Sequence, residues 1–374
     1  MLVLLVASSL TVLAAAILAP SLPGISGHFN DQPSALIPLV LTMPALSVAL
    51  AGGFAGRLGD RFGRKPVLIG SLALYAIAGT SGYLVDSLAA LLVGRALLGL
   101  GIAGVLSMTT TLIGDYFPPE ERTRFLGLQG AAMAGGGLLY LNLGGLLAEW
   151  SWRGPFLVYL CSLLLIPLCA WLLPEPKRCS PDSNPLRPLP RDTRLRVAIV
   201  YLIAATGMTL LYVVPTQLPF LLTDEVGVGS SLVALAISTT TITATLMSLV
   251  YGRVAQHLSS VRIYAIAFLL IAIGYGMTGF STLYWSITAG IALSGLGLGL
   301  FMPNGATWLM SFVPSTARAR VIGGYSSMIF LGQFLSPLVL APLTARVASL
   351  SSAFLFAAMI AAICAVLLAV SAER

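Results

Sequence analysis

Residues 56–68 read Gly56-Arg57-Leu58-Gly59-Asp60-Arg61-Phe62-Gly63-Arg64-Lys65-Pro66-Val67-Leu68. The stretch places five charges, four of them positive, between charge-free apolar runs at 32–56 and 66–85. A less charged copy, Gly252-Arg253-Val254-Ala255-Gln256-His257-Leu258, begins 196 residues later. A charged turn between long apolar runs, repeated half a chain later, predicts a duplicated design.

Composition places those apolar runs in a membrane. Hydrophobic residues make up 57% of the chain and charged residues only 9%, and the mean hydropathy is +0.95. Soluble domains carry about 25% charged residues, so this chain could not cover a water-facing surface. Eleven charge-free runs of 19 or more residues occur, at 1–30, 32–56, 66–85, 96–114, 125–148, 154–174, 197–223, 226–252, 263–317, 321–345 and 347–372.

A membrane-spanning helix needs about 20 apolar residues, so the 55-residue run 263–317 must hold two, with a turn near Ser281-Thr282. Spans in hydrocarbon must satisfy their own backbone groups and are therefore helical. The fold class expected is an all-α integral membrane protein with twelve transmembrane helices. The first run lacks a basic leader, which argues against a cleaved signal peptide, and Ala19-Pro20-Ser21-Leu22-Pro23 is expected to end the first helix.

Lysine and arginine predict the orientation. With both termini in the cytoplasm, 17 of the 20 basic residues lie in cytoplasmic segments, and only Arg153 and Arg346 lie in outer loops. The remaining one, Arg95, lies inside a span. The net charge of +7 is therefore explained by topology, and the scattered basic residues give no footprint for nucleic acid.

The two halves of the chain align over more than a hundred residues without a gap. Gly99 aligns with Gly295 and Arg122 with Arg318, at the same offset of 196. This predicts two pseudo-symmetric six-helix bundles, at 1–173 and 197–374, joined by a Pro-, Arg- and Ser-rich cytoplasmic linker at 174–196. Parallel six-helix repeats are typical of transporters whose binding site lies between the halves.

The charged stretch closely resembles the signature loop of the major facilitator superfamily, glycine-x-leucine-alanine-aspartate-arginine-x-glycine-arginine-arginine/lysine; only Gly59 departs, in the alanine position. The resemblance implies a conformational latch. In the family the aspartate, here Asp60, faces the cytoplasmic start of the eleventh helix, expected near Ser315-Thr316-Ala317, and the arginine, here Arg64, pairs with an acid ending the fourth helix. The latch would lock the outward-facing state, and its expected residues are Gly56, Asp60, Arg61, Gly63, Arg64 and Asp115.

Arg95 is the one charge within a span, in Gly94-Arg95-Ala96-Leu97-Leu98-Gly99-Leu100-Gly101, and its repeat equivalent is Ile291. A charge near the bilayer centre costs about 2.5–3.5 kcal/mol, so a role that offsets the cost is expected. The segment resembles the arginine-x-x-x-glycine motif of family exporters, which implies a role in proton coupling or in binding substrate charge. The alternative is an arginine that snorkels to the interface.

The other residues expected to contact a solute are uncharged and lie within the fifth, seventh, tenth and eleventh spans. They are Tyr140, Asn142, Tyr212, Gln217, Asn304, Trp308, Tyr325 and Gln333. A mostly apolar cavity with one cation suits an amphipathic or anionic organic molecule better than a sugar.

Proton coupling is left open. The antiporter motif of the fifth helix is broken, with Tyr140 and Leu141 where the family has glycine and proline. No acidic residue lies at mid-span, so a proton carrier would have to come from a span end, such as Asp115 or Glu149. His28 and His257 are expected in loops. We expect no metal site and no cofactor.

The expected function is secondary active transport of a small organic solute by alternating access, most simply export, by a monomer embedded in membrane lipid. The expected location is the bacterial cytoplasmic (inner) membrane. One alternative is an importer or facilitator of a nutrient or metal-chelate complex, and another is a non-transporting receptor. An enzyme is not expected, because the sequence holds no metal cluster, nucleophile–base pair or phosphate loop.

Overall fold

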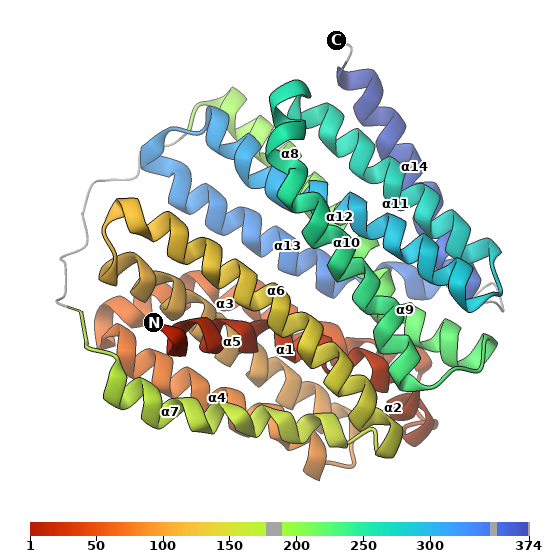
Figure 1. Cartoon of the computed structure of the whole chain (residues 1–374), viewed down its shortest axis with the longest axis horizontal. Coiled ribbons are helices and arrows are strands. Elements are labelled where there is room, and N and C mark those ends of the chain that lie inside the picture. The colour runs from red at the N-terminus through yellow and green to blue at the C-terminus, as the bar shows by residue number, and fades with distance from the viewer. Residues whose placement is uncertain (177–188, 345–349, 373–374) are drawn as a thin grey trace. The chain divides into compact units, whose positions relative to one another are not determined.

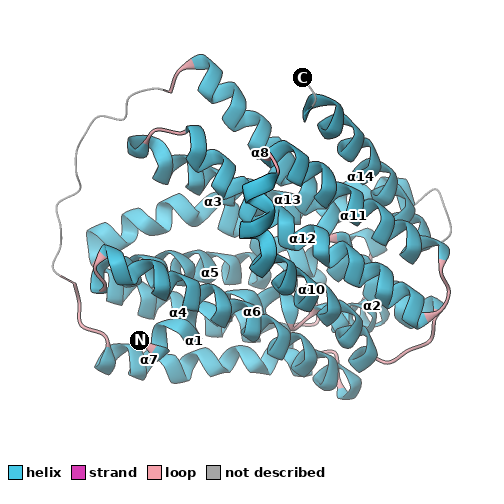
Figure 2. Ribbon diagram, turned by 45° about the horizontal axis from the view of Figure 1, so that its top comes forward, coloured by secondary structure: helices cyan, strands magenta, loops and turns pink. Residues whose placement is uncertain are grey.

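The computed structural model describes residues 1–176, 189–344 and 350–372, and the elements in these ranges are helices (Figure 2). The chain divides into two compact units, unit 1 at Met1–Pro185 and unit 2 at Leu186–Arg374. Each unit is described by itself. Cys179, Arg346 and most of the expected linker lie outside the described residues.

The described part of unit 1, residues 1–176, contains seven α-helices (Figure 1) and three short 3-10 segments. They are α1 (Leu2–Ala16), η1 (Ala19–Ser21), α2 (Leu22–His28), η2 (Ser34–Leu36), α3 (Leu39–Phe62), α4 (Arg64–Leu84), α5 (Leu88–Tyr116), α6 (Pro119–Trp150), η3 (Gly154–Leu160) and α7 (Cys161–Leu172).

Among its described residues, 189–344 and 350–372, unit 2 contains seven α-helices and one π-helical segment, η4. They are α8 (Arg191–Leu211), α9 (Val213–Phe220), η4 (Leu221–Glu225), α10 (Ser230–His257), α11 (Ser260–Phe280), α12 (Tyr284–Phe312), α13 (Ser315–Thr344) and α14 (Ser351–Ala372).

Twelve segments of the described chain are long and apolar enough to cross a membrane, which confirms the predicted number. The long run 263–317 divides close to the predicted turn, because α11 ends at Phe280 and α12 begins at Tyr284. The eleventh span is the α13 helix, which begins at Ser315 as expected.

The first span is broken rather than ended at its prolines, so the expected helix end at 19–23 is wrong. α1 stops at Ala16, and the chain continues through η1 and α2 to His28 as one membrane-length segment. Pro20 and Pro23 lie in the first turns of η1 and α2, where a missing backbone N–H costs nothing. Unit 2 has a similar break within two residues of the equivalent position, at Tyr212 between α8 and α9.

The close contacts between helices in unit 1 recur in unit 2 at the same sequence offset. A side chain at Gly99 on α5 would meet the carbonyl oxygen of Pro44 on α3. A side chain at Gly295 on α12 would meet the carbonyl oxygen of Thr240 on α10, and both residues are offset by 196 from the first pair. The same offset relates the contact of Gly101 with Ser71 to that of Gly297 with Ala267. The two bundles therefore share one packing scheme, in which glycines let backbones approach.

Candidate functional site

Arg95 is almost fully buried inside unit 1, with 1% of its surface exposed. Its Nε donates to the carbonyl of Val40 at 2.7 Å, its Nη1 to the hydroxyl of Tyr159 at 2.8 Å, and its Nη2 to the carbonyl of Ala14 at 2.5 Å. These partners come from α3, η3 and α1, so Arg95 on α5 joins four segments.

This arrangement differs from one of the two expectations for Arg95, that it snorkels to the interface. The side chain does not snorkel, because it is buried and its nitrogens donate within the unit. Its three described partners are two carbonyls and a phenol, with no carboxylate among them. The expected preference for an amphipathic or anionic solute rested in part on this cation, and it stays a prediction. A direct role in binding solute stays a prediction.

The structure brings three of the expected latch residues together at one end of unit 1. Arg64, in the first turn of α4, forms an ion pair with Asp115 at the end of α5. Asp60, on the last turn of α3, is more distant: its carboxylate lies 3.8 Å from Arg64 and its side chain is 58% exposed. Arg64 is therefore held mainly by Asp115, and Asp60 keeps an accessible carboxylate.

At two positions of the charged stretch the structure explains why the residue is glycine, once by backbone conformation and once by packing. Gly63 joins α3 to α4 with φ at 100°, in a region that residues with side chains rarely adopt. Gly59, which stands in the family's alanine position, lies against Met108 of α5, so a side chain there would require the methionine to move.

Glu175, just beyond α7, completes this cluster and was missed by sequence reasoning. Its carboxylate accepts hydrogen bonds from the backbone N–H groups of Arg64 at 2.7 Å and Lys65 at 3.0 Å. It thereby caps the N-terminus of α4, where negative charge is also favoured by the helix dipole. Lys65 in turn donates to the carbonyl of Ala170 at 2.6 Å. Glu175 and Arg64 are 111 residues apart in the sequence, so no local pattern predicts their contact.

Glu175→Ala should lower the midpoint of thermal unfolding by about 2–4 °C, because losing a helix cap costs about 1 kcal/mol. Glu175→Gln should lose less, since its amide oxygen still accepts one hydrogen bond. The comparison is made on purified full-length chain in detergent. Equal midpoints for wild type and Glu175→Ala would contradict the capping role.

One of the two candidates on α6, Tyr140, contacts α1. The hydroxyls of Tyr140 and Ser9 are hydrogen bonded at 2.9 Å, and the Asn142 amide donates to the carbonyl of Leu138 at 2.8 Å. The glycines of α6 provide the close approach: a side chain at Gly136 would meet Ser9, and one at Gly144 would meet the carbonyl oxygen of Ile17. The broken antiporter motif thus retains its helix-packing glycines.

Gln129 is a buried amide that sequence reasoning also missed. It is 5% exposed, and its Nε2 lies 2.8 Å from the hydroxyl of Ser8 and 3.2 Å from those of Thr109 and Thr110. It links α6 to α1 and α5. Its presence inside the charge-free run 125–148 was the signal that could have singled it out.

In unit 2 the candidates separate into buried and half-buried groups. Asn304 is fully buried, donates to the carbonyl of Ser260 at 2.8 Å and accepts from the hydroxyl of Tyr251 at 3.3 Å. Tyr325 is 3% exposed and packs against Gly305. The half-buried candidates, which retain accessible surface, are Tyr212, Gln217, Trp308 and Gln333.

The opposite end of unit 1 carries a second charged cluster. Arg153 forms an ion pair with Asp86, and the Nε2 atom of His28 lies 3.6 Å from the same carboxylate. The guanidinium of Arg153 also lies over the Trp152 ring, 4.8 Å from its centroid. His28, expected in a loop, is the last residue of α2. The cluster ties together the ends of the first, third and fifth spans.

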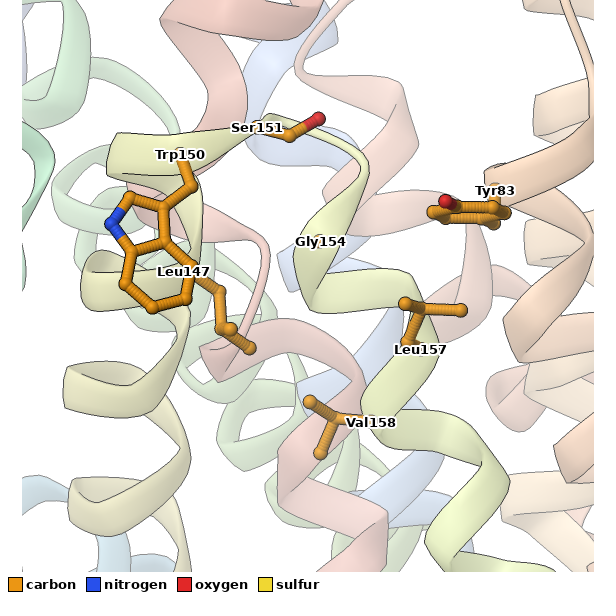
Figure 3. Close-up of a pocket in the computed structure, with 7 residues that line it drawn as sticks. All are labelled: Tyr83, Leu147, Trp150, Ser151, Gly154, Leu157 and Val158. Atoms are coloured by element: carbon orange, nitrogen blue, oxygen red, sulfur yellow. The ribbon is translucent and has the colours of Figure 1, made fainter.

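A shallow, mainly apolar pocket of about 490 Å³ lies next to this end of unit 1 (Figure 3). It is formed by the end of α6, the start of η3 and Tyr83 of α4, and none of the expected solute residues lines it. Its lining residues are Tyr83, Leu147, Trp150, Ser151, Gly154, Leu157 and Val158.

The family model and the similar proteins described below all point to one family. The family model described as Major Facilitator Superfamily matches residues 4–212 and 197–374. The chain is 34% identical over 127 residues to the bacillibactin exporter of Bacillus subtilis (strain 168), which covers 32% of each protein. It is 30% identical over 172 residues to the inner membrane transport protein YnfM of Escherichia coli (strain K12), covering 45% of the chain and 40% of the relative. The matches thus span less than half the length of these relatives.

The similarity of fold extends over the whole chain. The crystal structure of a D-xylose-proton symporter superimposes with a TM-score of 0.80 at 13% identity, covering 98% of this chain and 96% of that one. At this identity the likeness concerns the fold alone.

Proposed function

The chain belongs to the major facilitator superfamily, a family of membrane transporters rather than enzymes, and we propose that it exports a small amphipathic organic solute by alternating access. The observation that carries the proposal is the repeated break in the first and seventh spans, after Ala16 and at Tyr212, within two residues of equivalent positions. Broken helices in matching positions of two repeats are typical of the solute site in transporters.

Export is favoured over import by the similarity to the bacillibactin exporter. We propose that the half-buried candidates contact the solute, because their side chains keep accessible surface; they are Tyr140, Asn142, Tyr212, Gln217, Trp308 and Gln333. Arg95, Asn304 and Tyr325 are buried and hydrogen bonded or packed within their own units, which supports a positioning role for them.

We further propose that Asp60 is the exposed half of a latch. Arg64 is occupied by Asp115, while the side chain of Asp60 is 58% exposed within its own unit. In the family pattern the partner of this aspartate is the start of the eleventh helix, and the proposed contact would hold the outward-facing state.

Flux through proteoliposomes containing the full chain tests transport. Ethidium and carboxyfluorescein serve as cationic and anionic amphipathic probes, with and without an imposed proton gradient. We expect flux of at least one probe above that of empty liposomes, and faster flux with the gradient. Flux that ignores the gradient supports a facilitator, and binding without flux supports a receptor.

The topology makes a separate prediction. Both termini and Cys179 are expected on the cytoplasmic face, because the basic residues are concentrated there. An impermeant thiol reagent should therefore label Cys179 in lysed but not in intact cells, and Cys179→Ser should remove the signal. Labelling of Cys179 in intact cells would show that the orientation is opposite to the predicted one.

A further inference from the structure

Pro44 lies inside α3 and leaves one carbonyl of that helix without its usual partner. In an α-helix the N–H of residue 44 would bond to the carbonyl of residue 40, and proline has no N–H. The Nε of Arg95 donates to this carbonyl of Val40, at 2.7 Å. The guanidinium therefore stands where the helix lacks its own donor.

The two helices meet in a fixed register around this bond. Val40 and Pro44 are one turn apart on α3, and Arg95 and Gly99 are one turn apart on α5, so each pair shares a helix face. Arg95 contacts Val40, and the absence of a side chain at Gly99 lets α5 approach the carbonyl of Pro44.

Unit 2 provides an internal comparison. Thr240 stands at the position of Pro44, within α10, a helix that contains no proline. Gly295 makes the same close approach to Thr240 that Gly99 makes to Pro44. Ile291, the equivalent of Arg95, is fully buried. Where the proline is absent the arginine is absent, although the backbone contact is the same.

The carbonyl at the helix break has a donor in both units. In unit 1 Ala14 accepts from Arg95 and also from the hydroxyl of Tyr159, at 3.0 Å. In unit 2 the equivalent carbonyl of Leu210 accepts from Tyr275 at 2.9 Å. Loss of Arg95 would thus leave Ala14 with Tyr159, while Val40 would lose this bond and has no N–H at residue 44 to replace it.

We propose that Arg95 is a positioning residue that supplies the hydrogen bond removed by Pro44, and that the two residues form one interdependent unit. Through Val40, Ala14 and Tyr159 it holds α3, the end of α1 and η3 in one arrangement beside the break in the first span. The cost of burying its charge is offset by three hydrogen bonds from a charged donor. This inference does not depend on which solute is transported.

A double-mutant cycle on the purified full-length chain tests it, with Arg95→Ile, Pro44→Thr and the two combined; each replacement is the residue found in unit 2. Arg95→Ile should lower the thermal midpoint by about 5 °C or more, because a buried carbonyl is left unpaired. Pro44→Thr restores an N–H to α3, so the double variant should recover more than half of that loss. A matched control combines Arg95→Ile with Pro167→Ala, which removes a proline inside α7 of the same unit and should give no recovery.

Spin labels at Ser34 and Phe54, two exposed positions on either side of Pro44, report the helix geometry. Arg95→Ile should broaden the distance distribution, and the added Pro44→Thr should narrow it again. If Arg95→Ile does not accumulate, the folded yields of the two double variants are compared instead. The variant with Pro44→Thr should then yield more folded protein than the variant with Pro167→Ala. Additive effects of the two substitutions, or equal recovery with Pro167→Ala, would overturn the proposal. Absence of probe flux in proteoliposomes would overturn the proposed transport while leaving this result unchanged.

Discussion

Gly144→Val is expected to lower the thermal midpoint of the protein by about 10 °C. A side chain at this position on α6 would meet the carbonyl oxygen of Ile17, at the break in the first span. That oxygen belongs to the backbone, so it cannot rotate away as a side chain would. Overpacking of this kind costs about 3 kcal/mol, which corresponds to a fall of about 10 °C in the thermal midpoint.

Gly135→Val is the matched control. It lies on the same helix, and apart from the adjacent backbone of α6 no atom lies within 4 Å of the position its Cβ would occupy. Valine is also a better helix former than glycine, so the control should be neutral or slightly stabilising. Monodispersity by size-exclusion chromatography and the thermal midpoint in detergent decide the outcome. Similar behaviour of the two variants would show that the contact between α6 and α1 does not limit stability.

Asp60→Asn should reduce probe flux about tenfold while leaving the thermal midpoint of the protein unchanged. The proposed latch contact needs a charge, and a change of about 1.4 kcal/mol in a conformational equilibrium is a tenfold change in population. Stability should hold because an exposed ion pair contributes only about 0–1 kcal/mol, and Asp60 is 58% exposed.

Glu121→Gln is the control for this variant, because it removes one exposed carboxylate from the first turns of α6 on the expected cytoplasmic side. It should transport like wild type. The spin-label distance between the two units should shift in Asp60→Asn only. Normal flux and an unchanged distance in Asp60→Asn would leave the charges of 56–65 with a role in topology alone.

Much of the architecture could be predicted because membrane-length apolar runs and an offset of 196 are visible in a single sequence. The pairing of Arg64 with Asp115 followed from a family resemblance, and the structure places these residues together. Glu175 could not be found in this way. Its partners are backbone N–H groups on α4, and any carboxylate at a span end looks alike in the sequence.

Arg95 shows a different limit. Its charge, its isolation within a span and its mismatch with Ile291 were all visible, and they indicated an unusual residue. Its partners were not, because two of the three are backbone carbonyls, which have no residue type. Pro44 was the usable signal, since a proline inside a helix frees the carbonyl four residues earlier. Similarly, Pro20 indicated an interruption of the first helix. It did not indicate whether the span ends there or continues as a second helix, because that depends on the path of the chain after the proline.

The position of the acceptors along the chain has a consequence for synthesis. The carbonyls of Ala14 and Val40 precede Arg95, whereas Tyr159 follows it by 64 residues. When the ribosome delivers the fourth span to the bilayer, two of the three acceptors for its arginine are therefore already present in the first and second spans. The guanidinium can therefore exchange water for these two carbonyls while the bundle is only partly assembled. The sixth span then adds the third acceptor, the hydroxyl of Tyr159.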